Sequence, residues 1–135
     1  MTTMERDTAK EQARMQLDGI IELMKALPDG GEVDGGTLTG EQVSDRIQED
    51  PLSIQVRTDW YTPGETDNKP TDYNILLCTG GPACRIIGEL DQYCQPENAR
   101  IEYQDWFTPW TEYRETTTEE DHMLLQYTQQ FYFGD

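Results

Sequence analysis

The sequence predicts an α+β fold, in which a four-stranded antiparallel meander has N-terminal and C-terminal helices packed on one face. Apolar residues recur at helical spacing near both ends of the chain, whereas the middle contains short apolar or alternating segments divided by Gly and Pro. Short connections between these segments favour antiparallel strands. The length of 135 residues suits one compact core. We therefore expect one domain over 1–135, composed of a helical acidic segment (1–50), a β meander (51–110), and an acidic turn with a C-terminal helix (111–135).

Two helices are expected in the first of these segments. Apolar residues at helical spacing, with charged residues between them, predict an amphipathic helix over about 3–27 that ends at a Pro-Asp-Gly-Gly sequence. A Gly-rich acidic loop is expected over 29–36. Thr39 is followed by Gln42 at the spacing of a capping box, in which each side chain bonds the backbone of the other residue. This pair predicts a short second helix over 39–49.

The meander is expected to contain strands over 53–60, 73–79, 84–90 and 100–107. The first alternates, with Ile54, Val56 and Trp60 on one side, and is typical of a half-buried strand. The second and third are apolar on both faces, as interior strands are, and the Gly-Gly-Pro between them indicates a hairpin turn. The segment 62–72 is rich in Pro, Gly and Asn, and we expect it to be an exposed loop.

A final helix is expected near the C-terminus. Thr117 and Glu120 have the spacing of a second capping box. The apolar residues that follow recur at helical spacing as far as Phe131. These two signals predict a helix that runs from Thr117 to about Phe131.

The charge of the chain is strongly negative, with 27 acidic and 10 basic side chains and a formal net charge of -17. The excess is uneven: segment 1–50 has 12 acidic and 5 basic residues, 51–100 has 7 and 4, and 101–135 has 8 and 1. Such a field repels nucleic acids and anionic membranes, and it attracts basic protein surfaces. We therefore expect no direct binding of nucleic acid and no binding of membranes.

The candidate partner-binding residues are carboxylates concentrated in two groups. The first group is Asp29, Glu32, Asp34, Glu41, Asp45, Glu49 and Asp50, and the second is Glu112, Glu115, Glu119, Glu120 and Asp121. Proteins that grip duplex DNA do so with arrays of Lys and Arg, and a folded protein that displays carboxylates densely can occupy such an array instead. Stabilisation of helix dipoles, or a merely solvated surface, is the alternative explanation for either group.

An aromatic motif occurs twice, because Asp-Trp-aromatic-Thr-Pro occupies both 59–63 and 105–109. Two explanations remain open. The motifs mark neighbouring strand ends, where Trp packs inward and Pro blocks further pairing, or they contribute to an aromatic patch that binds a partner. The patch would contain Trp60, Tyr61, Trp106, Phe107 and Trp110, and Trp110 is expected to be its most exposed member.

A search for catalytic groups finds no specific constellation. His122 follows three carboxylates, Glu119, Glu120 and Asp121, a setting that suits a surface residue and does not mark a catalytic base. Cys78 and Cys84 lie on expected interior strands, and the spacing of these residues and Cys94 matches no zinc pattern. We expect no catalytic residue, metal or cofactor. The odd number of cysteines and the absence of an apolar leader or membrane span are typical of a cytoplasmic protein.

The segments Tyr73–Leu90 and Gln104–Trp110, together with the acidity and the lack of a catalytic signature, carry a resemblance. The chain is similar to uncharacterised proteins of bacteriophages and mobile elements, and it resembles the small inhibitors that such elements use against host defences, including DNA-mimicking anti-restriction and anti-CRISPR proteins. The resemblance implies a cytoplasmic location in a bacterial host cell and a basic protein complex as partner. It implies no catalytic residue.

The first hypothesis is therefore a non-enzymatic inhibitor of a nucleic-acid-handling host defence complex, in which the two acidic groups meet a basic groove and the aromatic motif adds apolar contacts. Two alternatives remain. One is an adaptor module that binds a protein partner through Trp106 and Trp110. The other is a small thiol-dependent enzyme built around Cys84 and His122.

Overall fold

The computed structural model describes residues 2–27, 29–65, 69–79, 82–105 and 108–134, with side chains from residue 9 onward. Its helices are α1 (Thr2–Ala26), α2 (Gly40–Glu49) and α3 (Thr118–Thr128). Its strands are β1 (Gly30–Val33), β2 (Gly36–Thr39), β3 (Ser53–Thr58), β4 (Pro70–Cys78), β5 (Ala83–Glu89), β6 (Arg100–Gln104) and β7 (Thr111–Glu112). The predicted α+β class is confirmed.

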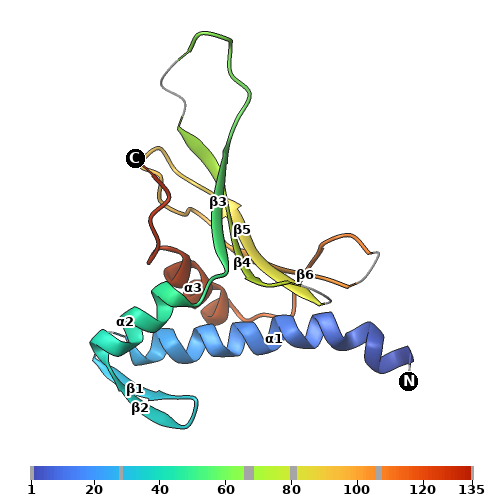
Figure 1. Cartoon of the computed structure of the whole chain (residues 1–135), viewed down its shortest axis with the longest axis vertical. Helices are drawn as coiled ribbons and strands as arrows, with labels where there is room; N and C mark the ends of the chain where they lie inside the picture. The colour runs from blue at the N-terminus through green and yellow to red at the C-terminus, as the bar shows by residue number, and fades with distance from the viewer. Residues whose placement is uncertain (1, 28, 66–68, 80–81, 106–107, 135) are drawn as a thin grey trace.

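The main sheet has five strands in the order β3-β4-β5-β6-β7, and every neighbouring pair is antiparallel. The prediction of a meander is therefore correct, and the prediction of four strands is wrong. The additional strand, β7, has only two residues, Thr111 and Glu112, which is too short for a pattern of alternation to reveal. Figure 1 shows β3 at the edge of this sheet, with residues 59–65 after it extending away from the helices.

A second sheet occupies the segment that was expected to be a loop. β1 and β2 form an antiparallel hairpin in which Val33 pairs with Gly36 across a two-residue turn. Both turn residues have positive φ, 53° at Asp34 and 78° at Gly35. This is the backbone conformation of the Asp-Gly hairpin turn, which matches the twist of the flanking strands. The prediction of a loop over 29–36 is therefore wrong.

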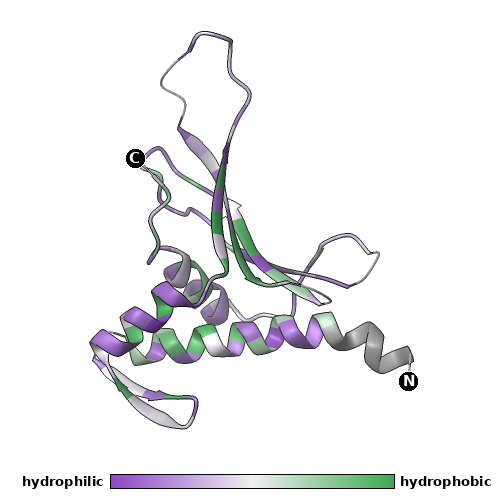
Figure 2. Ribbon diagram, in the orientation of Figure 1, coloured by the Kyte–Doolittle hydropathy of each residue, from purple (hydrophilic) through white to green (hydrophobic). Residues whose placement is uncertain are grey.

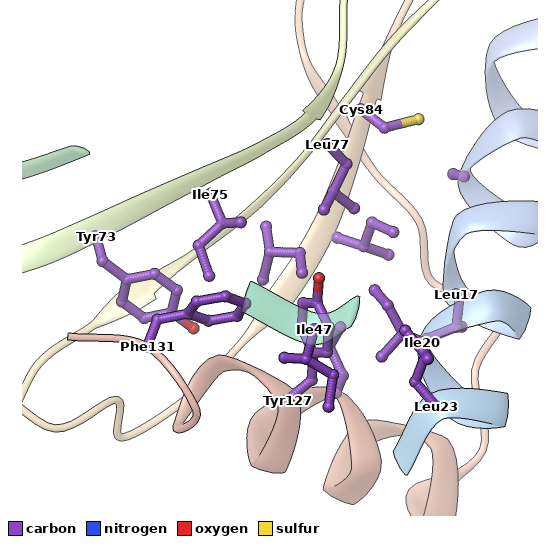
Figure 3. Packing of buried hydrophobic residues seen from close by; sticks show 14 of the residues in the cluster. Leu17, Ile20, Leu23, Ile47, Tyr73, Ile75, Leu77, Cys84, Tyr127 and Phe131 are labelled. Atoms are coloured by element: carbon purple, nitrogen blue, oxygen red, sulfur yellow. The ribbon is translucent and has the colours of Figure 1, made fainter. Parts of the chain in front are cut away.

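The helices cover one face of the main sheet, and the core lies between them. α1 packs against β5 and β6, and α3 packs against α1. Figure 3 shows Ile75 and Leu77 of β4 directed toward α1 and α3, with Leu17 and Tyr127 approaching from the helices. Figure 2 shows the same division, with apolar residues on the inner side of α1 and polar residues outside. We call the opposite face of the sheet the open face.

The helix ends agree closely with the predictions. In α2 the Thr39 hydroxyl accepts a hydrogen bond from the Gln42 N–H at 3.2 Å, and the Gln42 side chain accepts one from the Thr39 N–H at 2.9 Å. Thr117 and Glu120 form the equivalent pair of bonds at the start of α3. Both predicted capping boxes are confirmed. α3 ends at Thr128, earlier than predicted, although the chain beyond it remains packed on the core.

The largest error in burial concerns β3. A half-buried strand was predicted, and all six residues of β3 are exposed. α1 covers β5 and β6, at the other side of the sheet, so no partner in α1 reaches the apolar side chains of β3. The strand ends at Thr58, β4 begins at Pro70 inside the predicted loop, and β6 ends at Gln104. The rest of the predicted strand 100–107 includes positions outside the described residues.

Membrane insertion of a helix is not supported by the described part of the chain. None of its helices is both long enough and apolar enough to cross a bilayer.

Candidate functional site

The first acidic group lies on α2 and on the β1–β2 hairpin, which pack against each other. We call this region the acidic end, and it comprises Asp29, Glu32, Asp34, Glu41, Asp45, Glu49 and Asp50, all of which are exposed. Figure 1 shows α2 and the hairpin together at one end of the molecule, and Figure 2 shows the polar surface of α2. The fold therefore gathers the whole first group into one region.

α2 presents three of these carboxylates in a row. Val43 and Ile47, four residues apart, are buried on the inner side of the helix. Glu41, Asp45 and Glu49 repeat at the same interval and are exposed. Residues four apart lie on the same face of a helix, about 6 Å apart along its axis. The outer side of α2 therefore carries a linear array of carboxylates, which we call the acidic stripe.

Folding gains little from the acidic stripe. Glu41 lies in the first turn, where a negative charge interacts favourably with the helix dipole and stabilises the helix. Asp45 has like charges four residues before and after it, an arrangement that destabilises a helix by a few tenths of a kcal/mol per pair. Glu49 is at the C-terminal end, where a negative charge opposes the dipole. The dipole therefore explains Glu41 but neither of the other two carboxylates.

Basic residues neutralise little of the acidic end. Arg46 forms an ion pair with Asp34 at 2.6 Å and thereby joins α2 to the hairpin turn. Although the residue Asp50 is exposed as a whole, its carboxyl group is partly desolvated, which raises its pKa, and it accepts a hydrogen bond from the Tyr127 hydroxyl at 3.5 Å. The remaining five carboxylates, Asp29, Glu32, Glu41, Asp45 and Glu49, form no ion pair with any residue whose side chain is described.

The second acidic group differs, because α1 supplies partners for it. Lys10 contacts Glu115 at 2.9 Å. Arg14 binds Glu120 through two hydrogen bonds, of 2.5 and 3.2 Å. The guanidinium of Arg114 lies 4.0 Å from the carboxylate of Glu112. Glu119 and Asp121 are exposed, and Asp121 accepts a hydrogen bond from the Thr116 hydroxyl. Glu115 and Glu120 of this group therefore join α1 to the segment before α3 and to α3 itself.

Glu120 illustrates this structural role, and its titration is testable. Hydrogen bonds from Arg14 and then from the Thr117 backbone hold the pKa of Glu120 below its ordinary value of 4.5. A carboxyl whose pKa is lowered by folding stabilises the folded state above its ordinary pKa. That contribution is lost as the pH falls from 4.5 through the lowered value.

Glu120→Gln should therefore lower the free energy of unfolding at pH 7 by about 1 kcal/mol, because glutamine keeps the capping geometry but loses the ion pair. The difference between wild type and variant should shrink below pH 4.5, the ordinary pKa. Urea denaturation at several pH values measures both effects. Glu119→Gln, at the exposed neighbour, should leave stability unchanged within about 0.5 kcal/mol. If Glu120→Gln lowered the free energy of unfolding equally at pH 3 and pH 7, this structural role of Glu120 would be contradicted.

The aromatic motifs are separated by the fold. β4 and β5 lie between β3 and β6, so the two motifs do not mark neighbouring strand ends. Trp60 is fully exposed, which contradicts inward packing, whereas Trp106 and Phe107 lie outside the described residues. Trp110 is half-buried, with the Arg85 guanidinium 4.1 Å from its ring centroid. The prediction that Trp110 is the most exposed member is therefore wrong, and Trp60 is the most exposed of the patch residues that the structure describes.

The thiols do not favour nucleophilic chemistry. Cys84 is completely buried, and burial, reinforced by the adjacent Cys78, raises the pKa of its thiol. The protonated thiol is a poor nucleophile, and no surface of the residue is open to a substrate. His122 is exposed on α3. Among the described residues, no group of three or more His, Cys, Asp or Glu could hold a metal ion.

The open face of the sheet is nearly balanced in charge. Arg57 pairs with Asp72 at 3.0 Å across β3 and β4. Glu102 of β6 accepts from Arg85 at 2.8 Å and lies 3.6 Å from Arg100. Three of the ten basic residues of the chain are therefore paired with carboxylates on this face. These three residues do not neutralise the acidic end.

No protein-family model matches this chain, and neither a characterised protein nor a solved structure matches it.

Proposed function

We propose that this protein is a non-enzymatic inhibitor that binds the basic groove of a nucleic-acid-handling host defence complex, of the anti-restriction or anti-CRISPR type. Its acidic end occupies the groove in place of nucleic acid. The protein acts in the cytoplasm of the bacterial host cell and needs no cofactor. The partner is a protein surface rich in Lys and Arg.

The observation that carries this proposal is the acidic stripe on α2. Its carboxylates are exposed, lie in a row, and have no ion-pair partner among the described side chains. Asp45 and Glu49 weaken the helix that carries them, so their placement calls for an explanation outside folding. Repeated negative charge along a rigid element is the feature by which a basic groove binds a nucleic-acid backbone.

The two acidic groups differ in how far their charge is neutralised by ion pairs, and this difference supports the first group as the main contact. The second group is largely occupied by Lys10, Arg14 and Arg114, whereas the acidic end is neutralised only through Arg46 within the described side chains. We therefore assign the main contact to α2 and the β1–β2 hairpin. Glu119 and Asp121 contribute at most a peripheral contact.

The proposal is tested by competition. The immobilised chain is incubated with bacterial lysate at low salt, and the retained proteins are eluted with duplex DNA or with increasing NaCl. We expect a DNA-binding or RNA-binding complex that both eluents release, because the chain and the nucleic acid compete for one groove and because salt screens their charges. The purified partner should then lose its nucleic-acid binding when the chain is added.

Two results would contradict the proposal. One is a partner that binds the chain and its nucleic acid at the same time. The other is a complex whose affinity does not change with salt, since a contact between carboxylates and a basic groove depends strongly on ionic strength.

A further inference from the structure

The edge formed by β3 has no second strand beside it in the described part of the chain. There β3 pairs with β4 alone, so the backbone groups on its other side have no strand partner. The opposite edge of the sheet, β7, has two residues and includes Glu112. Proteins protect sheet edges with short strands and charges, and β7 has both features. β3 has six residues with one charged side chain, Arg57, and is therefore suited to pairing.

Side chains of β3 and of Leu52, the residue before it, add an apolar row to this edge. Leu52, Ile54 and Val56 are 59, 38 and 46% exposed, respectively. Ile54 pairs with Ile75 and Val56 with Tyr73, so both lie on the face of the sheet that carries the helices. The helices leave this corner uncovered. Trp60 and Tyr61, just beyond the strand, are also exposed.

We propose that this edge binds a second copy of the chain, with β3 pairing antiparallel to β3 of that copy about a two-fold axis at Gln55. The pairing joins the two main sheets into one continuous sheet. It satisfies the free backbone groups of both edges and covers both apolar rows. A two-fold, isologous interface is the commonest arrangement in homo-oligomers.

The register follows from the regularity of the strand. β3 keeps one unbroken register with β4 from Ser53 to Arg57, and a bulge follows between Arg57 and Thr58. Gln55 is the centre of this regular stretch. A two-fold axis there places Ile54 opposite Val56 of the second copy on the helix-bearing face, and Ser53 opposite Arg57 on the open face.

This symmetric match is what favours a second copy over a strand from another protein. Both Ile54–Val56 pairs are apolar, and each Arg57 meets a serine, so no like charges face each other. β-branched pairs across antiparallel strands are stabilising. The stretch Ser53–Arg57 contains no carboxylate.

The net charge of each copy opposes dimerisation but does not prevent it. α2 is joined to the start of β3 by residues 50–52, so the two-fold axis places the two copies of α2 at opposite ends of the paired strands. Five residues of strand span about 17 Å, and charges are screened over about 8 Å at physiological ionic strength. Raising the salt concentration should therefore strengthen the dimer, whereas it weakens the complex with a basic groove.

Sedimentation equilibrium of the wild-type chain over a concentration series, at low and high salt, tests the proposal. We expect a monomer–dimer equilibrium whose dissociation constant falls as salt is added. Val56→Lys should raise this constant at least tenfold, because it places a charge in the apolar row of each copy. Met15→Lys is the control, since Met15 is an exposed apolar residue of α1 far from β3 in the sequence, and it should leave the constant unchanged. Circular dichroism confirms that each variant is folded.

The register is tested by charge exchange at Gln55. Gln55→Lys and Gln55→Glu should each impair the dimer, because like charges then face each other at the axis. An equimolar mixture of the two variants should restore it. A wild-type chain that stays monomeric at every concentration overturns the proposal, and so does a dimer that survives Val56→Lys. A mixture that fails to recover overturns the register at Gln55.

Discussion

Replacing Glu41, Asp45 and Glu49 by lysine should weaken the complex with the basic partner by about 100-fold or more, because the substitution turns an attractive array into a repulsive one. All three side chains are exposed, so the fold should survive. The three lysines still place like charges four residues apart, and the unfavourable dipole interaction created at position 41 offsets the favourable one created at position 49, so thermal stability should change little. Calorimetric titration of the purified partner measures the affinity, and thermal denaturation measures the stability.

A second triple variant with the same change in net charge shows whether the affinity depends on where the carboxylates lie or only on the net charge. Glu11, Asp59 and Glu97 are exposed carboxylates outside the two acidic groups, and replacing these by lysine changes the net charge equally. The control should reduce the affinity only slightly, through the long-range field. Equal losses in both triple variants would mean that bulk charge alone attracts the partner, and the assignment to α2 would be abandoned.

Gly88→Ala should strongly destabilise the fold. Gly88 is buried in β5, where an added Cβ would overlap the carbonyl oxygen of Asn98 and lie 2.7 Å from the Tyr73 hydroxyl. That hydroxyl donates a hydrogen bond of 2.6 Å to the same carbonyl. The methyl group would have to displace the backbone or break this bond, at a loss of about 3 kcal/mol or more of unfolding free energy. Urea denaturation measures the loss.

Gly19→Ala should instead stabilise the protein, and it serves as the comparison for Gly88→Ala. Gly19 lies in α1, and an added Cβ there meets no atom within 4 Å. Alanine is the better helix former, so this variant should gain up to about 1 kcal/mol. If both alanine variants changed stability by similar amounts, close packing around Gly88 would not be the cause.

Local signals in the sequence were sufficient for the helices. Each capping box involves two residues three positions apart, so Thr39 with Gln42 and Thr117 with Glu120 could be identified without knowledge of the fold. The turn at Asp34 and Gly35 was also visible, because Asp-Gly is a strong hairpin signal. The flanking strands have only four residues each, and the glycines among them were interpreted as a loop.

The other errors, in burial and in the role of the acidic groups, came from contacts between distant parts of the chain. The alternation in β3 indicates a strand with an apolar side, but which strands the helices cover depends on the packing of α1 over β5 and β6. The partners of the second acidic group were equally hidden, since Lys10 and Arg14 are separated from Glu115 and Glu120 by 105 and 106 residues. The sequence thus revealed both acidic groups. It could not show that the second group is largely engaged in ion pairs within the fold, whereas most of the first group is not.

The ion pair between Arg46 and Asp34 fixes the hairpin against α2, and so fixes where the uncompensated charge sits relative to the rest of the molecule. Most other described bases are paired near the sheet and α1, so the centres of positive and negative charge do not coincide. A molecule with such a dipole moment experiences a torque in the field of a basic groove. In the function proposed here, the acidic end should therefore turn toward the basic groove before contact, and a larger share of collisions should be productive.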